Sequence, residues 1–212
     1  LHIIPNFVDT DLFVTESSTK LPTEFLSEPG FINMLYAGNI GLAQEWDLVL
    51  NLANEIRDES ITIWIIGEGI KKEYLKTQVE KHNLSNIKLL PYQDRKYMPA
   101  INLFADFHFI AMDKSMENEG FPSKVYSIMA SGRPMVIVSS ENTPITSFLN
   151  ETDTSLLVTD HSLSGFKNAV LKLAQDKELR TSLGANGRKI IDQDYTKEKV
   201  INQYVILFEK IV

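Results

Sequence analysis

Six short apolar runs alternate along the chain with stretches whose apolar residues recur at helical spacing. Most of the runs are continuous instead of alternating with polar residues, and Gly, Pro or a polar residue closes each of them: INMLYAG, ITIWIIG, NIKLLP, DFHFIAM, RPMVIVS and TSLLVT. Continuous apolar runs of this length are typical of strands buried on both faces of a parallel sheet. The stretches with helical spacing fall at about residues 44–57, 71–82, 123–131, 163–173, 177–193 and 196–212.

Strand–helix alternation of this length predicts βαβ units with right-handed crossovers. The fold class we predict is therefore α/β, a Rossmann-like doubly wound parallel sheet with a C-terminal helical tail. Residues 1–30 are predicted to be a linker segment, residues 31–195 one Rossmann-like domain and residues 196–212 a final helix. Ligands of such sheets bind beyond the carboxyl ends of the strands, where the strand order reverses. The loops that follow the apolar runs are therefore the first places to search for a site.

Composition and charge narrow the function classes. The 212 residues are 43% hydrophobic, which is enough for one buried core. Lys and Arg number 21 against 28 Asp and Glu, a formal charge of −7, which argues against a nucleic-acid partner. There is no Cys, which excludes disulfides and thiolate metal sites, and no apolar run approaches the ~20 residues that span a bilayer. The chain opens on Leu1 instead of Met, so we expect the natural N-terminus to lie upstream.

The loop after the first run, AGNIGLAQ, can bring backbone close to a ligand. Gly38 and Gly41 leave the main chain bare, and Asn39 and Gln44 offer neutral donors. A tight strand–helix turn explains the glycines equally well, and neither a G-x-G-x-x-G nor a Walker-type motif is present.

The loops after the second and third runs give weaker signals. Gly67 belongs to a GEG segment, for which a glycine turn that opens a helix is the favoured interpretation. Tyr92 lies in PYQDRKYMP, a loop that could place backbone groups against a base.

The loop after the fourth run, MENEGFPSKVYSIMASGRP, is the most informative. Pro122 suits a first helical position with Ser123 beside it, and a helix N-terminus attracts anions such as a diphosphate. Lys124 is unexpected there, because a cation in the first turn opposes the helix dipole. A bound anion, an ion pair with Glu117 or Glu119, or simple solvation would each resolve that conflict.

Other polar residues carry little functional signal. Asp9 and Asp11 form an Asp-x-Asp pair that chance explains in a chain this rich in Asp. The four histidines lack metal-ligand spacing, so we predict no metal site. His108, inside an apolar run, is interpreted as a core or rim residue.

The order of these motifs along the chain is similar to that of a known family. The segments IIPNFVDTDLF, LYAGNIGLAQEWD, IIGEG, LLPYQDR, FADFHFIAM, EGFPSKVYSIMASGRPMV and YTKEKVINQYVILFEKI resemble the C-terminal, donor-binding domain of retaining family-four GT-B glycosyltransferases. Within that family the chain is most similar to bacterial enzymes of the colanic-acid and N-acetylfucosamine transferase type. The resemblance implies a missing N-terminal acceptor domain, to which the final helix would return. It also implies a cytoplasmic protein whose peripheral contact with the inner face of the membrane, if any, is made through the missing half.

The resemblance also assigns roles to residues. Glu119 matches the first acid of the family's Glu-x7-Glu motif, whose role is contact with the donor sugar near the reacting carbon. The second acid, which usually holds the ribose, falls at Ser127. A basic pair that binds the diphosphate in many members is replaced by Asn39 and Gln44, which leaves Lys124 as the remaining cation. The donor and phosphate contacts that we predict are Gly38, Asn39, Gly41, Gln44, Gly67, Tyr92, Gly120, Phe121, Pro122, Ser123, Lys124 and Ser127.

The hypothesis that follows is transfer of a sugar from a nucleotide diphosphate sugar, expected to be a uridine diphosphate (UDP) sugar, to a glycan or lipid-linked acceptor in polysaccharide biosynthesis. The resemblance implies no metal and no cofactor, and we expect this stretch alone to be inactive. Two alternatives stay open. One is a sugar-nucleotide 2-epimerase of the same two-domain fold, and the other is a degenerate, non-catalytic nucleotide-binding module.

Overall fold

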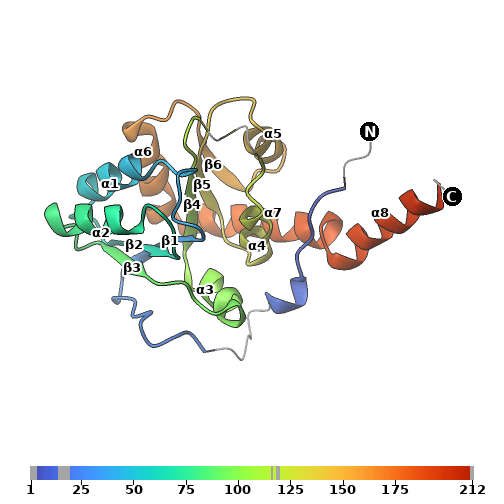
Figure 1. The fold of residues 1–212 in the computed structure, drawn as a ribbon, viewed down its shortest axis with the longest axis horizontal. Coiled ribbons are helices and arrows are strands. Elements are labelled where there is room, and N and C mark those ends of the chain that lie inside the picture. The colour runs from blue at the N-terminus through green and yellow to red at the C-terminus, as the bar shows by residue number, and fades with distance from the viewer. Residues whose placement is uncertain (1–3, 14–19, 116, 118–119, 211–212) are drawn as a thin grey trace.

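A parallel sheet of six strands forms the centre of the computed structural model, which describes residues 4–13, 20–115, 117 and 120–210. The strands lie in the order β3-β2-β1-β4-β5-β6 (Figure 1). Their bounds are β1 Ile32–Ala37, β2 Ile61–Ile66, β3 Ile87–Leu90, β4 Phe107–Ala111, β5 Met135–Val138 and β6 Ser155–Val158. The order reverses between β1 and β4, which are neighbours with Met34 opposite Phe107. All six predicted strands and the predicted fold class are confirmed.

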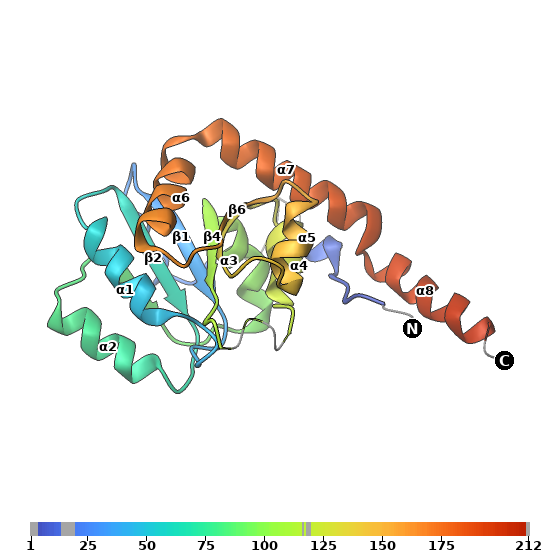
Figure 2. The same cartoon turned by 90° about the horizontal axis from the view of Figure 1, so that it is seen from above.

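Helices cover both faces of the sheet (Figure 2). One face packs against α1 (Trp46–Glu55), α2 (Lys72–Lys81) and α6 (Leu163–Gln175). The other face packs against α3 (Met98–Phe104), α4 (Lys124–Ala130) and α5 (Pro144–Asn150), with α7 (Lys177–Asp194) against α4. This double cover is the reason why β2, β4 and β5 are buried along their whole length and read as continuous apolar runs.

Side-chain caps fix where several helices begin. Ser162 accepts a hydrogen bond from Gly165 N at the start of α6, and Asp176 accepts one from Leu179 N at the start of α7. Each cap satisfies a backbone N–H that has no partner inside the helix. The helix starts predicted near residues 163 and 177 therefore have a local cause.

The helices α3 and α5, each seven residues long, were not predicted from the sequence. The predicted loop PYQDRKYMP contains a 3-10 turn, Arg95–Tyr97, and runs into α3. A helix of two turns is too short to show a clear period. For α5 a local signal was present, since Thr143 and Thr146 form a capping box and Pro144 follows at the first helical position.

The N-terminal segment runs beside the start of the last helix, where Val8 N donates a hydrogen bond of 3.1 Å to Tyr195 O. Phe13 is buried against α4 and α7, and Phe25 stacks on Trp64 with ring centroids 5.5 Å apart, so part of the N-terminal segment belongs to the core. The last helix, α8 (Lys197–Glu209), projects away from the sheet (Figures 1 and 2). It leaves five large apolar side chains exposed: Ile201, Tyr204, Val205, Ile206 and Phe208. Among the described residues, no helix combines the length and apolar character required to cross a membrane.

Candidate functional site

A cavity of about 380 Å³ opens at the carboxyl edge of the sheet, beside the point where the strand order reverses. Four of the predicted donor-binding residues line it, although they come from the loop after β1 and from the start of α4: Gly38, Ser123, Lys124 and Ser127. Asn6, Phe7 and Val8 of the N-terminal segment form part of the same wall, although the sequence placed them only in a segment that resembles the family and not in the site. This cavity is the candidate site.

Glycine is required at the ends of β1 and β2. Gly38 has φ +152° and Gly67 has φ +148°, a conformation that L side chains rarely adopt. A Cβ on Gly67 would lie 1.9 Å from the backbone oxygen of Gly38, and one on Gly38 would lie 2.6 Å from Lys124 Nζ. Because neither glycine carries a side chain, the end of β2 at Gly67 can lie against Gly38, and Lys124 can lie against Gly38.

Lys124 has an aromatic ring as its neighbour and no carboxylate partner among the described residues. Its Nζ lies 3.7 Å from the ring centroid of Tyr36, and no Asp or Glu oxygen among the described residues comes within 4.0 Å of it. Burial lowers the pKa of Lys124 to about 7, because the charged form loses its water. The face of an aromatic ring recovers only part of that loss. The site therefore holds a partly buried ammonium group that a bound anion would stabilise.

The structure removes two of the explanations that the sequence left open for Lys124, simple solvation and an ion pair with Glu117, whereas an ion pair with Glu119 is not tested by the described residues. The side chain is mostly buried, so simple solvation does not account for it. Glu117 points elsewhere and hydrogen bonds to His161. Glu119, the predicted contact to the donor sugar, lies outside the described residues, so its role stays a prediction.

The remaining residues of the first loop close it onto α1. Gly41 O accepts a hydrogen bond of 2.8 Å from Trp46 Nε1, and Tyr36 Oη donates one of 2.7 Å to Asn39 O. Asn39 itself is exposed at the edge. Gln44 forms a bridge with Met112, and its Oε1 is buried without a hydrogen-bond partner among the described residues. The first loop is thus anchored to the segment that follows β4.

The other predicted contacts differ in how much of each side chain is free. The Phe121 ring packs 5.3 Å from the rings of both Tyr126 and Phe148, so that side chain serves the core. Ser127 Oγ donates to Lys124 O within α4 at 2.9 Å. Gly120 is exposed, and Pro122 is half-buried just before α4. Tyr92 is 68% exposed at the end of β3.

His108 is a core residue, as interpreted from its apolar run. It is buried, and its Nε2 lies 3.2 Å from Asn102 O. Burial lowers the pKa of His108 to about 3, so the ring is neutral at physiological pH and needs only that one partner.

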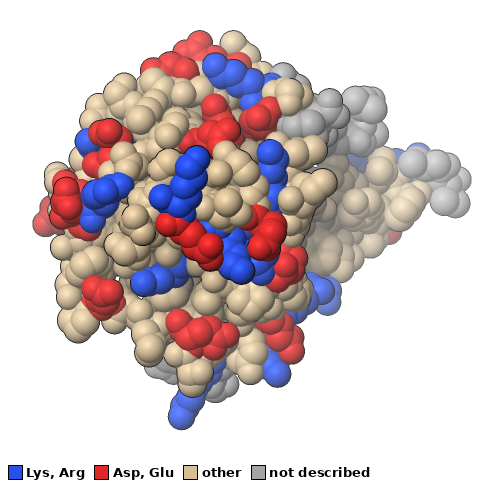
Figure 3. Space-filling view, turned by 60° about the vertical axis from the view of Figure 1, so that its left-hand side comes forward, with Lys and Arg blue, Asp and Glu red and all other residues tan. Residues whose placement is uncertain are grey.

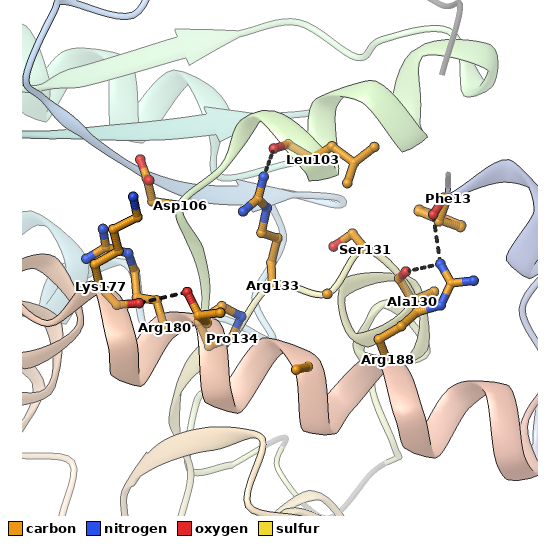
Figure 4. A pocket seen from close by; sticks show the side chains of 13 residues that line it. Phe13, Leu103, Asp106, Ala130, Ser131, Arg133, Pro134, Lys177, Arg180 and Arg188 are labelled. Atoms are coloured by element: carbon orange, nitrogen blue, oxygen red, sulfur yellow. Dashed lines mark hydrogen bonds between the residues drawn. The ribbon is translucent and has the colours of Figure 1, made fainter. Parts of the chain in front are cut away.

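A second cavity, of about 570 Å³, lies at the opposite edge of the sheet (Figure 4). Three arginines line it, and each donates to a carbonyl at the C-terminal end of a helix. Arg133 Nη2 reaches Leu103 O of α3, Arg188 Nη1 reaches Ala130 O of α4, and Arg180 Nη1 reaches Ala174 O of α6. Such carbonyls have no partner inside their own helix. The basic character of this cavity therefore has a structural cause.

The charged surface shows mixed signs. On the face in Figure 3, which lies on the side of α1 and α2, Lys and Arg are interspersed with Asp and Glu. A broad positive field does not form there, in keeping with the formal charge of −7. An anion is bound more readily by a local cation such as Lys124 than by such a surface.

Comparison with known proteins identifies the family. Residues 18–190 match the family described as glycosyl transferases group 1. The chain belongs to this family. It is 30% identical over 112 residues to WcaI of Escherichia coli strain K12, which is named as a colanic acid biosynthesis glycosyl transferase. That match covers 53% of this chain and 28% of WcaI.

Two further proteins are similar over nearly the whole chain. The lipopolysaccharide core biosynthesis glycosyltransferase LpsE of Rhizobium meliloti is 21% identical, with 98% of this chain and 57% of LpsE covered. The crystal structure of Anabaena HepE in complex with UDP-glucose has a TM-score of 0.82 at 16% identity and covers 99% of this chain and 57% of HepE. The chain therefore has the fold of one half of a GT-B glycosyltransferase. The resemblance predicted from the sequence is confirmed. The chain spans less than two thirds of the length of each of these proteins.

Proposed function

We propose that this glycosyltransferase chain is the donor-binding half of an enzyme that moves a sugar from a nucleotide diphosphate sugar to a glycan or a lipid-linked acceptor in polysaccharide biosynthesis. The donor that we propose is a UDP-sugar. Family membership supports the transferase class, and the likeness to a HepE structure that holds UDP-glucose supports the donor class.

The observation that carries the proposal is the ammonium group of Lys124 beside Gly38. When the bond between the anomeric carbon and the diphosphate oxygen breaks, negative charge develops on the leaving diphosphate. A cation already placed in a poorly solvated cavity stabilises that charge without further rearrangement. Lys124 supplies it where Asn39 and Gln44 stand in place of the basic pair of many family members.

The neighbouring residues take roles that suit their exposure. The bare backbone of Gly38 and the start of α4 at Ser123 would contact the diphosphate. The exposed ring of Tyr92 would lie against the base, and Glu119 would orient the sugar. Groups that activate the acceptor would lie in the half of the enzyme that precedes this one. We propose no metal and no cofactor for the transfer.

Calorimetric titration of the 212-residue protein with uridine, guanosine and adenosine diphosphates tests the proposal. We expect UDP to bind with and without magnesium. Binding at about pH 8 should take up protons, because the diphosphate stabilises the charged form of Lys124, and two buffers of different ionisation enthalpy measure that uptake. Failure of all three nucleotides to bind would contradict the proposal for this chain.

An activity assay addresses the alternatives. A 2-epimerase would release a changed nucleotide sugar with no acceptor present, whereas a transferase requires one. A degenerate module would bind nucleotide without turnover in the full-length protein, a possibility favoured by Ser127, whose hydroxyl is already bonded within α4. For the 212-residue chain alone we expect negligible transfer, and efficient metal-free turnover would contradict that expectation.

A further inference from the structure

His161 lies between two carboxylates at the carboxyl edge of the sheet. Its Nδ1 is 2.8 Å from Glu45 Oε2, and its Nε2 is 3.2 Å from Glu117 Oε2. Only 2% of the His161 side chain and 6% of the Glu117 side chain are exposed, so bulk water does not replace the bond between them. The described residues contain no group of three His, Asp or Glu that could hold a metal ion. Here each carboxylate is bonded to a ring nitrogen instead.

These contacts join four loops. Glu45 follows β1, Glu117 follows β4, Ser140 follows β5 and His161 follows β6. Ser140 N donates to Glu117 Oε2 at 2.9 Å, and Ser140 Oγ lies 3.3 Å from His161 Nε2. Because β1, β4, β5 and β6 are adjacent in the sheet, the network crosses the ends of four neighbouring strands.

Both ring nitrogens of His161 have polar partners. Nδ1 lies beside the Glu45 carboxylate, and Nε2 lies within reach of both the Glu117 carboxylate and the Ser140 hydroxyl. The ring therefore ties the loops of Glu45, Glu117 and Ser140 to its own. The further charges around the ring are the carboxylates of Asp113 and Asp160, with Lys71 beside Asp113.

Two more observations agree with a strong bridge. Burial alone would raise the pKa of Glu117, but hydrogen bonds from Ser140 together with the charge and hydrogen bond of His161 lower it overall. The backbone of His161 has φ +54°, a conformation that costs energy for residues other than glycine. That turn aims the ring inward, at the loops that surround the candidate site.

We propose that His161 is a positioning residue of the donor site. Through Nε2 it holds Glu117, seven residues before Lys124, and so fixes the approach of the chain to the start of α4. The inference rests on the proposed donor-binding function, and it adds that nucleotide affinity depends on a residue outside the cavity that holds Lys124.

The first test measures UDP affinity of the 212-residue protein by calorimetry. His161→Gln keeps one donor and one acceptor in place of the ring. We expect it to lower affinity about 3- to 10-fold. His82→Gln, an exposed histidine beyond the end of α2, is the matched control and should keep wild-type affinity.

Glu117→Gln tests the bridge from its other end. The amide keeps an acceptor for Ser140 N but has no charge for His161. We expect the same loss of affinity, and no further loss in the double variant, since both substitutions break one interaction. Additive losses, or a His161→Gln protein with unchanged affinity, would overturn the proposal.

A ligand-free measurement separates this inference from the proposed function. If wild-type protein binds none of the three nucleotides, the donor-binding function fails, and nuclear magnetic resonance decides whether the bridge exists. Without ligand, His161→Gln should shift the amide resonance of Ser140, which donates to Glu117, and His82→Gln should leave it unchanged. A Ser140 amide resonance that His161→Gln leaves unchanged would overturn the linkage.

Discussion

The cations at the two edges of the sheet differ in the partners that the fold gives them. At the amino edge Arg133, Arg180 and Arg188 donate to the last carbonyls of three helices, so each charge satisfies a need of the fold. At the carboxyl edge Lys124 lies in a poorly solvated position over Tyr36, and the described residues offer it no carboxylate. The larger of these two cavities is therefore structural, and the smaller one contains the group that is costly to keep without a ligand.

A buried charge that the fold satisfies contributes to stability, whereas a buried charge that the fold leaves unsatisfied costs stability and needs another reason to be present. Substitution of an arginine at the amino edge should therefore lower stability more than nucleotide affinity. Substitution of Lys124 at the carboxyl edge should lower nucleotide affinity more than stability.

The largest effect on stability is expected from Arg188→Ala. The change removes hydrogen bonds to Phe13 O and Ala130 O and the ion pair with Asp192, and it leaves two carbonyls without their donors. We expect a loss of about 2–3 kcal/mol in the free energy of unfolding, with unchanged UDP affinity of the folded protein. Urea denaturation measures it, and Lys189→Ala, an exposed neighbour, should stay within about 0.5 kcal/mol of wild type. Equal stability of both variants would break the assignment of a structural role to the amino edge.

At the carboxyl edge, Lys124→Met should weaken UDP binding while leaving the protein folded. A hydrogen bond to a charged group contributes about 1.5–3 kcal/mol, which corresponds to roughly 10- to 100-fold in affinity. The unliganded variant should be at least as stable as wild type, because a desolvated charge is removed. Calorimetry and thermal unfolding measure the two effects, with Lys114→Met, an exposed lysine of the segment after β4, as the charge-matched control. Unchanged UDP affinity in Lys124→Met would contradict the proposed role of Lys124 in binding the diphosphate.

The pH dependence of stability sharpens the same contrast. Lys124 has a pKa of about 7 in the folded protein, against about 10.4 in an unfolded chain. Between these values the unfolded chain binds more protons, so the stability of ligand-free wild type should rise with pH by about 1 kcal/mol per unit or less, and level off above about 10.4. Relative to Lys124→Met, wild type should be less stable near pH 7 and approach it as the pH rises. A constant difference from pH 7 to 9 would contradict the assignment.

The smallest effect is expected from Tyr92→Ala. The side chain is 68% exposed, so stability should change by no more than about 0.5 kcal/mol. Loss of stacking on the base should lower UDP affinity by roughly 5-fold. Tyr204→Ala, on the exposed face of α8, supplies the comparison and should leave affinity unchanged. Equal affinities of the two variants would remove Tyr92 from the proposed site.

Much of the fold could be predicted from the sequence, because burial on both faces of a sheet makes a strand apolar along its whole length. Trp64 lies in the middle of such a run and is buried in β2. The short helices α3 and α5 were missed because two turns do not establish a period. The prediction also separated residues 1–30 from the domain, whereas Phe13 and Phe25 are packed into its core.

The candidate site was predicted in part. Gly38 and Lys124 were singled out because their loops follow apolar runs, and the structure brings them together across 86 positions of sequence. Tyr36 was missed because in the sequence it is one more apolar residue of a buried strand. His161 was missed because its partners, Glu45 and Glu117, lie 116 and 44 residues away along the chain.

The sequence by itself determined the strands, most of the helices, the family and the loops that carry polar groups. Each of these depends on residues near one another along the chain, or on motifs whose order the family shares. Only the tertiary structure decided which of those groups meet, that Lys124 lies over Tyr36 without a described carboxylate, and that His161 bridges two loops. The physical reason is that the order of strands in the sheet sets the distances between loops, and a linear pattern of apolar residues reports burial without reporting neighbours.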